Sequence, residues 1–145
     1  MRTAPGSRRH PHLGRDQLEQ WLPDAGLAYR WEPRLGGFRR PAPDSPDTAW
    51  RHPAFRGYAG HLRTDDARAA LAGLAAADVP TAFLCSETVW WRCHRRLVAD
   101  ALVLLHGLPV EHLLPGRRTP HSPTPGARVT PEGVVYDAPT SAPAP

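Results

Sequence analysis

The sequence predicts a small three-layer α/β domain with a mostly parallel sheet, followed by a disordered, Pro-rich tail. Between residues 81 and 114, two short apolar runs flank a loop and an amphipathic helix pattern. This order is typical of a βαβ unit, whose two strands are parallel. From residue 115 the composition shifts to Pro, Gly, Ser, Thr and Arg, which does not favour a packed core. We therefore expect one α/β domain over residues 1–114 and a mostly disordered tail over 115–145, with a short docking strand near Tyr136.

The stretch before residue 80 is expected to be mainly helical. Apolar residues recur at helical spacing in three segments, and Thr64 is a typical N-cap residue followed by two acidic residues. The alternation over residues 27–31 predicts a short strand, and the Pro- and Gly-rich stretch 33–49 predicts a long loop. The three predicted helices span residues 14–22, 53–62 and 65–77.

Residues 80–114 contain the predicted βαβ unit. The run from Thr81 to Cys85 is short, apolar and bounded by turn signals, which predicts a buried strand. After a loop, apolar residues at helical spacing predict a helix from about Cys93 to His106, and Gly107 is placed to end it. A second strand is expected over residues 108–114.

Composition narrows the class of protein without identifying a partner. The formal net charge is +4 and Lys is absent, so all 18 basic residues are arginines. Arginine binds phosphate well, but a chain rich in Arg, Ala and Pro is also typical of GC-rich coding sequences. Two cysteines cannot build a disulfide scaffold. No apolar run approaches the roughly 20 residues of a membrane span, and the start lacks a signal peptide's apolar segment. We predict a cytoplasmic protein with reduced thiols and no membrane partner.

Four pieces of the sequence stand out when they are taken together. They are Arg2-Thr3-Ala4-Pro5-Gly6-Ser7-Arg8; Tyr29 with Leu35-Gly36-Gly37; Phe55-Arg56-Gly57-Tyr58-Ala59; and Cys85-Ser86-Glu87 with Cys93-His94-Arg95, Val110 and His112. In order and spacing they resemble the bacterial domain of unknown function 488 family. The resemblance implies a small cytoplasmic α/β domain with no settled activity.

One departure from the family concerns the start of the chain. Family members begin with a strand of the type Val-Asp-Val that leads into the arginine matching Arg2, whereas Met1 stands here where that strand would end. A parallel sheet that loses an inner strand exposes unpaired backbone groups. We therefore expect the first strand to lie upstream, which leaves an inactive truncated fragment as one alternative.

The candidate site lies just after the predicted strand that ends at Cys85. Ligands of open α/β sheets bind beyond the carboxyl ends of the strands, and a helix start favours anions and thiolates. One loop would bring Cys85 close to Glu87, Cys93, His94 and Arg95. An isolated cysteine is more often a small buried hydrophobic residue, but these neighbours favour a functional site.

The leading interpretation is an enzyme-like domain in which Cys85 is a reactive thiolate. Glu87 and His94 would be its polar partners, Cys93 a resolving thiol, and an anionic small molecule the substrate. A Cys-x5-Arg phosphatase loop is excluded because Trp91 occupies the sixth position after Cys85. Neither the reaction nor a cofactor follows from the sequence. Residues assigned to anion or ligand contact are Arg2, Ser7, Arg8, Tyr58 and Arg95.

Two alternatives use the same region. Cys85, Cys93 and His94 are zinc-type ligands, with Glu87 or His112 as a fourth ligand or base. However, the cysteines are widely spaced, and adjacent Cys93 and His94 would point to different faces of a helix. The other alternative is a non-catalytic nucleotide or nucleic-acid binding module, with a base stacked on tryptophan. It would use the arginines Arg2, Arg8, Arg39, Arg95 and Arg96 and the tryptophans Trp90 and Trp91.

Three features favour purely structural roles. Gly36-Gly37 predicts a sharp turn, because a third glycine of a dinucleotide fingerprint is missing. Phe55 and Tyr58 share a helical spacing that is more typical of core than of ligand contact. His121 lies in a Pro-rich segment and is expected to have no specific role.

Overall fold

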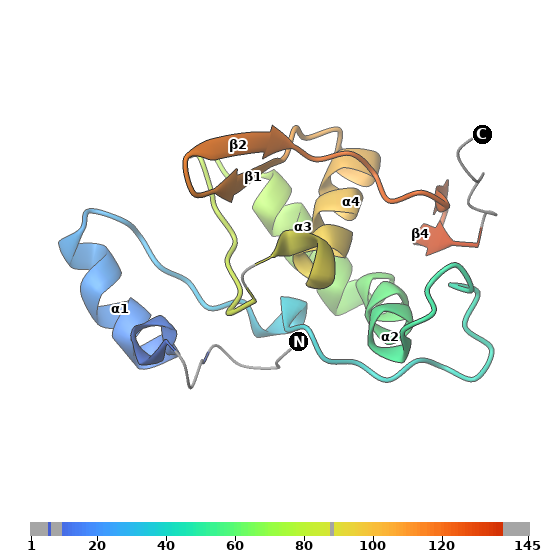
Figure 1. Ribbon diagram of the computed structural model, residues 1–145. Coiled ribbons are helices and arrows are strands. Elements are labelled where there is room, and N and C mark those ends of the chain that lie inside the picture. Colours follow the sequence, from blue (N-terminus) through green and yellow to red (C-terminus); the bar gives the residue numbers. More distant parts are fainter. Residues whose placement is uncertain (1–5, 7–9, 88, 138–145) are drawn as a thin grey trace.

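The computed structural model describes residues 6, 10–87 and 89–137. Within this part of the chain, four α-helices precede four short β-strands (Figure 1). The helices are α1 (Arg15–Asp24), α2 (Pro53–Leu62), α3 (Asp65–Ala75) and α4 (Arg95–His106), and the strands are β1 (Glu111–Leu114), β2 (Arg117–Pro120), β3 (Ala127–Thr130) and β4 (Gly133–Tyr136). The 3-10 turn η1 (Pro11–Leu13) precedes α1, η2 (Pro33–Leu35) lies between α1 and α2, and η3 (Trp90–Arg92) lies between α3 and α4.

The strands form two separate antiparallel hairpins, β1–β2 and β3–β4. The fold is therefore mixed α and β, but the predicted mostly parallel three-layer sheet is wrong. Turn chemistry explains the difference. Leu114 pairs with Arg117, so only Pro115 and Gly116 connect the strands, and Gly116 has a φ of 72°. A two-residue turn with glycine in the left-handed region directs the chain straight back into a hairpin.

The two runs expected to be the earlier strands are extended segments without strand partners among the residues described. Neither 27–31 nor 81–85 is part of a sheet. Leu84 is 51% exposed, whereas a buried strand would cover it. An apolar run alone does not specify a strand, since a strand also needs a neighbour for its backbone hydrogen bonds. Because β1 pairs with β2, the predicted βαβ unit does not exist.

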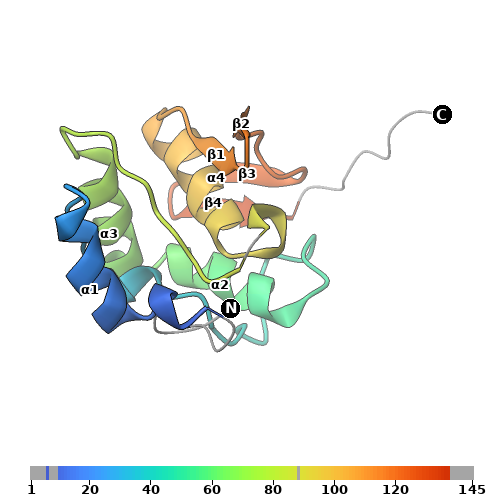
Figure 2. The ribbon, with the colours of Figure 1, turned by 60° about the vertical axis from the view of Figure 1, so that its left-hand side comes forward.

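The predicted helices are present, and α4 is the central one. It packs against α2, α3 and β4, and Figure 2 shows β4 beside it. Its inward residues include Leu97, which is fully buried. Gly107, with a φ of 64°, ends α4 as predicted. Thr64 caps α3, since its hydroxyl accepts a hydrogen bond from the Ala67 N–H at 3.4 Å.

The stretch after residue 114 is largely ordered, so the prediction of disorder is wrong for the strands between residues 117 and 136. The docking strand expected near Tyr136 is β4, whose four residues are all buried. Tyr136 and Val134 join the helical core, because Gly-containing turns fold the polar, Pro-rich stretch back onto α4. Residues 138–145 lie outside the described part. None of the helices that the structure describes has the length and apolar composition needed to cross a membrane.

Candidate metal and thiol site

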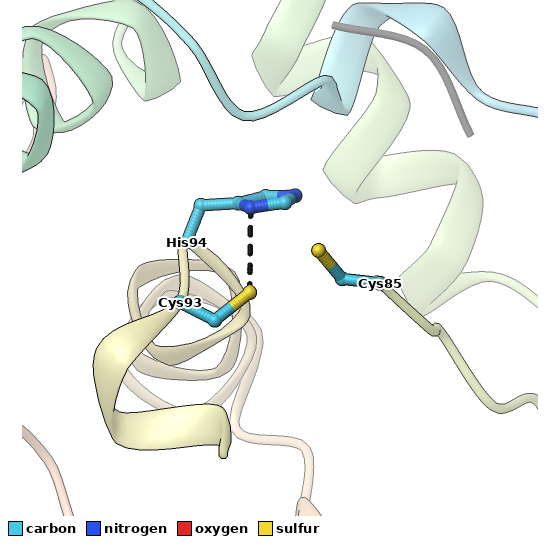
Figure 3. A group of neighbouring side chains, drawn as sticks. All are labelled: Cys85, Cys93 and His94. Atoms are coloured by element: carbon cyan, nitrogen blue, oxygen red, sulfur yellow. Dashed lines mark hydrogen bonds between the residues drawn. The ribbon is translucent and has the colours of Figure 1, made fainter. Parts of the chain in front are cut away.

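Two sulfur atoms and one imidazole meet beside the start of α4 (Figure 3). The side chains are those of Cys85, Cys93 and His94, and their potential ligand atoms all lie within 4.8 Å of one another. The Sγ atom of Cys93 is 3.4 Å from Nδ1 of His94. Cys93 is fully buried and Cys85 partly buried. The predicted grouping of these three residues is therefore present, although Cys85 follows an extended segment rather than a strand.

The backbone at Cys93 allows both of these adjacent side chains to reach the same place. Cys93 is extended, with φ −130° and ψ 154°, and its N–H closes the preceding turn on the Trp90 carbonyl at 3.1 Å. His94 is the N-cap, so α4 begins only at Arg95. The expectation that Cys93 and His94 would diverge from opposite helix faces is wrong, because Cys93 lies outside the helix.

The His94 ring is held by Tyr58 and Gly37, which come from other parts of the chain. The Tyr58 ring meets it edge-on, with 5.1 Å between the centroids. The Tyr58 hydroxyl donates to the Leu35 carbonyl at 2.8 Å, and the residue is fully buried. A Cβ atom on Gly37 would lie 2.4 Å from His94 Nδ1, so only glycine permits this approach. Tyr58 thus packs against His94, and Gly37 has a role beyond a turn.

Glu87 contributes its backbone to the site. The Glu87 N–H hydrogen-bonds the Cys85 thiolate, and the Glu87 carbonyl accepts a hydrogen bond from Arg95. The Glu87 side chain itself is exposed. Neither its carboxylate nor His112 belongs to the cluster of ligand atoms found among the described residues. The structure therefore does not bring the Glu87 carboxylate to the sulfur atoms.

The hydrogen bonds of the cluster favour one thiolate and one thiol. The pKa of Cys85 is lowered, chiefly because the Cys93 thiol hydrogen-bonds to its thiolate, with His94 and the Glu87 backbone adding to the effect against the cost of burial. The same bond and burial raise the pKa of Cys93. The lowered pKa favours the thiolate at Cys85, and the thiolate is both the nucleophilic and the metal-binding form of cysteine.

Arg95 adds positive charge beside the cluster. Its guanidinium donates to the Glu87 carbonyl and hydrogen-bonds Cys93. Its Nε atom is buried and has no hydrogen-bond partner in the described structure. A buried N–H without a partner is costly, and an anionic ligand would supply the missing acceptor.

Among the described residues, two other arginines considered for anion binding, Arg39 and Arg96, bond elsewhere. Arg2, Ser7 and Arg8 lie outside the described residues. The Nε atom of Arg96 donates to Thr124 Oγ1 at 2.8 Å, and Arg96 borders a separate cavity of about 180 Å³ with Trp50 and Tyr136. Arg39 donates to its neighbour, the Phe38 carbonyl, at 2.8 Å. Of the three such arginines that the structure describes, Arg95 is the one beside Cys93.

One face of the Trp90 ring is covered by the protein itself. Its ring stacks on His112, with 3.6 Å between centroids and 3° between the planes. It also contacts Trp91 edge-on, with centroids 5.7 Å apart. Trp90 therefore packs against the protein.

A second polar group was missed by sequence reasoning. His121, expected to have no role, is buried and bonded to Asp100 at 2.8 Å and to His112 at 2.9 Å. The residues lie far apart in sequence, so no local spacing connects them. The signals available were that Asp100 interrupts the apolar face of α4 and that His112 belongs to the fourth family-like piece.

Comparison with known proteins agrees with the resemblance in the sequence. The model of the family described as "Domain of unknown function DUF488" matches residues 1–102. No curated protein and no solved structure matches the chain significantly. The match spans more than half of the 145 residues and includes Cys85, Cys93 and His94. The chain belongs to the DUF488 family.

Proposed function

We propose that this protein binds one zinc-type divalent ion through Cys85, Cys93 and His94, and that an anionic small molecule binds at the open position beside Arg95. The observation that carries the proposal is the convergence of two sulfurs and one imidazole nitrogen within 4.8 Å. Thiolate and imidazole are the ligands that zinc prefers in proteins. The sequence argued against this site because Cys93 and His94 would point to different faces of a helix. That argument does not apply, because the Cys93 backbone is extended and lies outside α4.

The spacing of the donors supports the fit. Zinc–sulfur bonds of about 2.3 Å and zinc–nitrogen bonds of about 2.0–2.1 Å give a sulfur–nitrogen edge of roughly 3.5 Å in a tetrahedron. The Cys93 Sγ to His94 Nδ1 distance is 3.4 Å. The contacts of His94 with Tyr58 and Gly37 fix the orientation of the ring, as partners of a metal ligand usually do.

The arrangement favours a reactive centre over a purely structural one. The cluster contains three ligands, without a fourth from Cys, His, Asp or Glu in the part of the chain that is described. Three protein ligands with one open position are typical of catalytic zinc, whereas structural sites usually have four. Such an ion supplies Lewis acidity and an activated water when bound. The Arg95 guanidinium, whose buried Nε atom has no partner among the described residues, would bind and orient the anionic group of the substrate.

The test is the metal content of the purified full-length chain, measured by native mass spectrometry and by elemental analysis. We expect about one zinc per chain. We expect loss of metal from C85S, C93S and H94N, and retention in H106N, which removes the exposed histidine at the end of α4. A wild-type chain that is metal-free as purified and does not take up added zinc would refute the proposal.

Thiol chemistry by Cys85 is the second candidate, and one observation favours it. The Cys85 sulfur shares its cluster with a thiol and an imidazole, the partners that activate a cysteine nucleophile. Iodoacetamide labelling followed by mass spectrometry separates the candidates. A metal-free protein with rapid labelling at Cys85, slowed in H94N, supports the thiol reading. Labelling that appears only after a chelator removes zinc supports the metal reading.

A further inference from the structure

A chain of buried polar side chains runs from α4 to Trp90, separate from the cysteine cluster. Asp100 is fully buried, and its Oδ1 atom is 2.8 Å from Nε2 of His121. Nδ1 of His121 is 2.9 Å from Nε2 of His112. The His112 ring then stacks on Trp90. We call Asp100, His121 and His112 the relay.

The surroundings of Asp100 determine where the protons lie. Besides His121, the Thr124 N–H donates to Oδ1 at 2.8 Å, and the Tyr136 hydroxyl donates to Oδ2 at 2.9 Å. Both oxygens of Asp100 therefore act as hydrogen-bond acceptors. His121 therefore carries its proton on Nε2, facing Asp100.

The position of the proton on His121 determines the position of the proton on His112. When His121 is neutral, its Nδ1 has a lone pair and accepts a hydrogen bond from His112 Nε2–H. A neutral His112 with its proton on Nε2 has a lone pair on Nδ1. No protein group in the described residues hydrogen-bonds that atom. The relay thus leaves one basic nitrogen at its outer end.

The groups around His112 keep it neutral near pH 7. Its pKa is lowered to about 4, first by burial and then by the positive charge of His121 and Arg95, while Asp100 acts weakly in the opposite direction. Trp90, the stacked neighbour, carries no charge. These titratable and charged groups, from α4 and from the segment after β2, face His112.

We infer that Nδ1 of His112 is a proton acceptor for a bound anionic ligand that carries a weakly acidic O–H or N–H group. In the step, the ligand gives its proton to His112 Nδ1, while the Nε2 proton of His112 passes to His121 Nδ1. The positive charge then rests on His121, in contact with the Asp100 carboxylate. No oxidant or other reactant is needed. Asp100 and His121 are positioning residues, and Arg95, whose positive charge acts on His112, would bind the ligand's anionic group.

A network with a purely structural role would look different. The bonds from Asp100 to Thr124 and Tyr136 already join α4 to the stretch after β2 and to β4. Those bonds do not require a fixed tautomer on His112. The response of His112 Nδ1 to an added anion is therefore the readout that a structural role alone would not produce.

The first measurement is nitrogen-15 NMR of the imidazole groups in the full chain, metal-bound or metal-free, near neutral pH. We expect both His112 and His121 to carry the proton on Nε2. Y136F, which keeps the charge of Asp100 and loses one hydrogen bond, should leave both tautomers unchanged. D100N should lower the pH at which the pair takes up a proton by about one unit or more. A His112 that carries its proton on Nδ1 would overturn the inference, and this wild-type result stands even if D100N does not fold.

The second measurement uses inorganic phosphate as the probe and sulfate as its control, because sulfate has no acidic O–H near neutral pH. Phosphate should shift the Nδ1 resonance of His112, and sulfate should not. R95Q should weaken the phosphate response about tenfold or more, whereas R92Q, at an exposed position, should not. Equal responses to both anions, or none, would contradict the inference. The His94 resonances report the metal site separately, so failure here leaves the metal proposal standing.

Discussion

Replacing Gly37 by alanine tests whether the approach of this loop to His94 shapes the site. The added Cβ would lie 2.4 Å from His94 Nδ1 and 2.7 Å from its Cε1. Ordinary contact begins near 3.4 Å, so the ring must move away by about 1 Å. It cannot do so freely, because the Tyr58 ring and Cys93 Sγ both contact it.

The displacement should weaken metal binding and also lower the stability of the fold. Changing a group that orients a metal ligand typically costs 10–100-fold in affinity, or about 1.4–2.8 kcal/mol. Overpacking should cost about 1–3 kcal/mol of stability. Zinc affinity would be measured by competition with a chromophoric chelator, and stability by urea unfolding of the metal-free chain.

Gly73 provides the matched control. It lies within α3, and a Cβ there would meet nothing within 4 Å. G73A should leave zinc affinity unchanged and stabilise the chain by about 0.5–1 kcal/mol, since alanine favours a helix interior. If G37A binds zinc as tightly as wild type, the reasoning that Gly37 positions His94 is refuted.

Three further predictions concern stability. Asp47 is fully buried and pairs with Arg63 at 2.7 Å. D47A should lower the free energy of unfolding by about 3–5 kcal/mol, because the arginine charge loses its partner. A decrease below about 1 kcal/mol in urea unfolding would contradict this prediction. T64A removes the hydroxyl that caps Ala67 N–H and should cost about 1 kcal/mol, measured in the same way; an unchanged midpoint would argue against the cap. The pKa of His112 is lowered from 6.5 to about 4, so the unfolded chain binds more protons in this window and stability should fall as pH drops through it. H112Q should flatten that pH dependence, and an equally steep profile in H112Q would assign it to other groups.

The helices could be predicted because their determinants are local. Apolar spacing fixed the inward face of α4, Thr64 marked the start of α3 and Gly107 the end of α4. The sheet could not be predicted in this way, because the same apolar run suits a parallel or an antiparallel neighbour. The turn at Gly116 decides between them, and it lies in a stretch whose composition suggested disorder.

The candidate site was predictable only where its parts are close in sequence. Cys85, Cys93 and His94 are separated by one short loop, so their grouping followed from the sequence. The contact of Gly37 with His94 was not predictable, nor was the bond from Asp100 to His121. Such contacts depend on packing between distant segments, which leaves no periodic pattern in the sequence.

The hydrogen-bond partners of Asp100 show which part of the chain must fold together with α4. The family match ends at residue 102, just past Asp100, yet the groups that hydrogen-bond its carboxylate belong to His121, Thr124 and Tyr136. A cut between residues 102 and 121 would leave a charged side chain buried on α4 with no donor. The region matched by the family model is therefore shorter than the segment that must fold together. Exchanging residues 1–102 alone between family members would separate the buried Asp100 carboxylate from the groups that hydrogen-bond it.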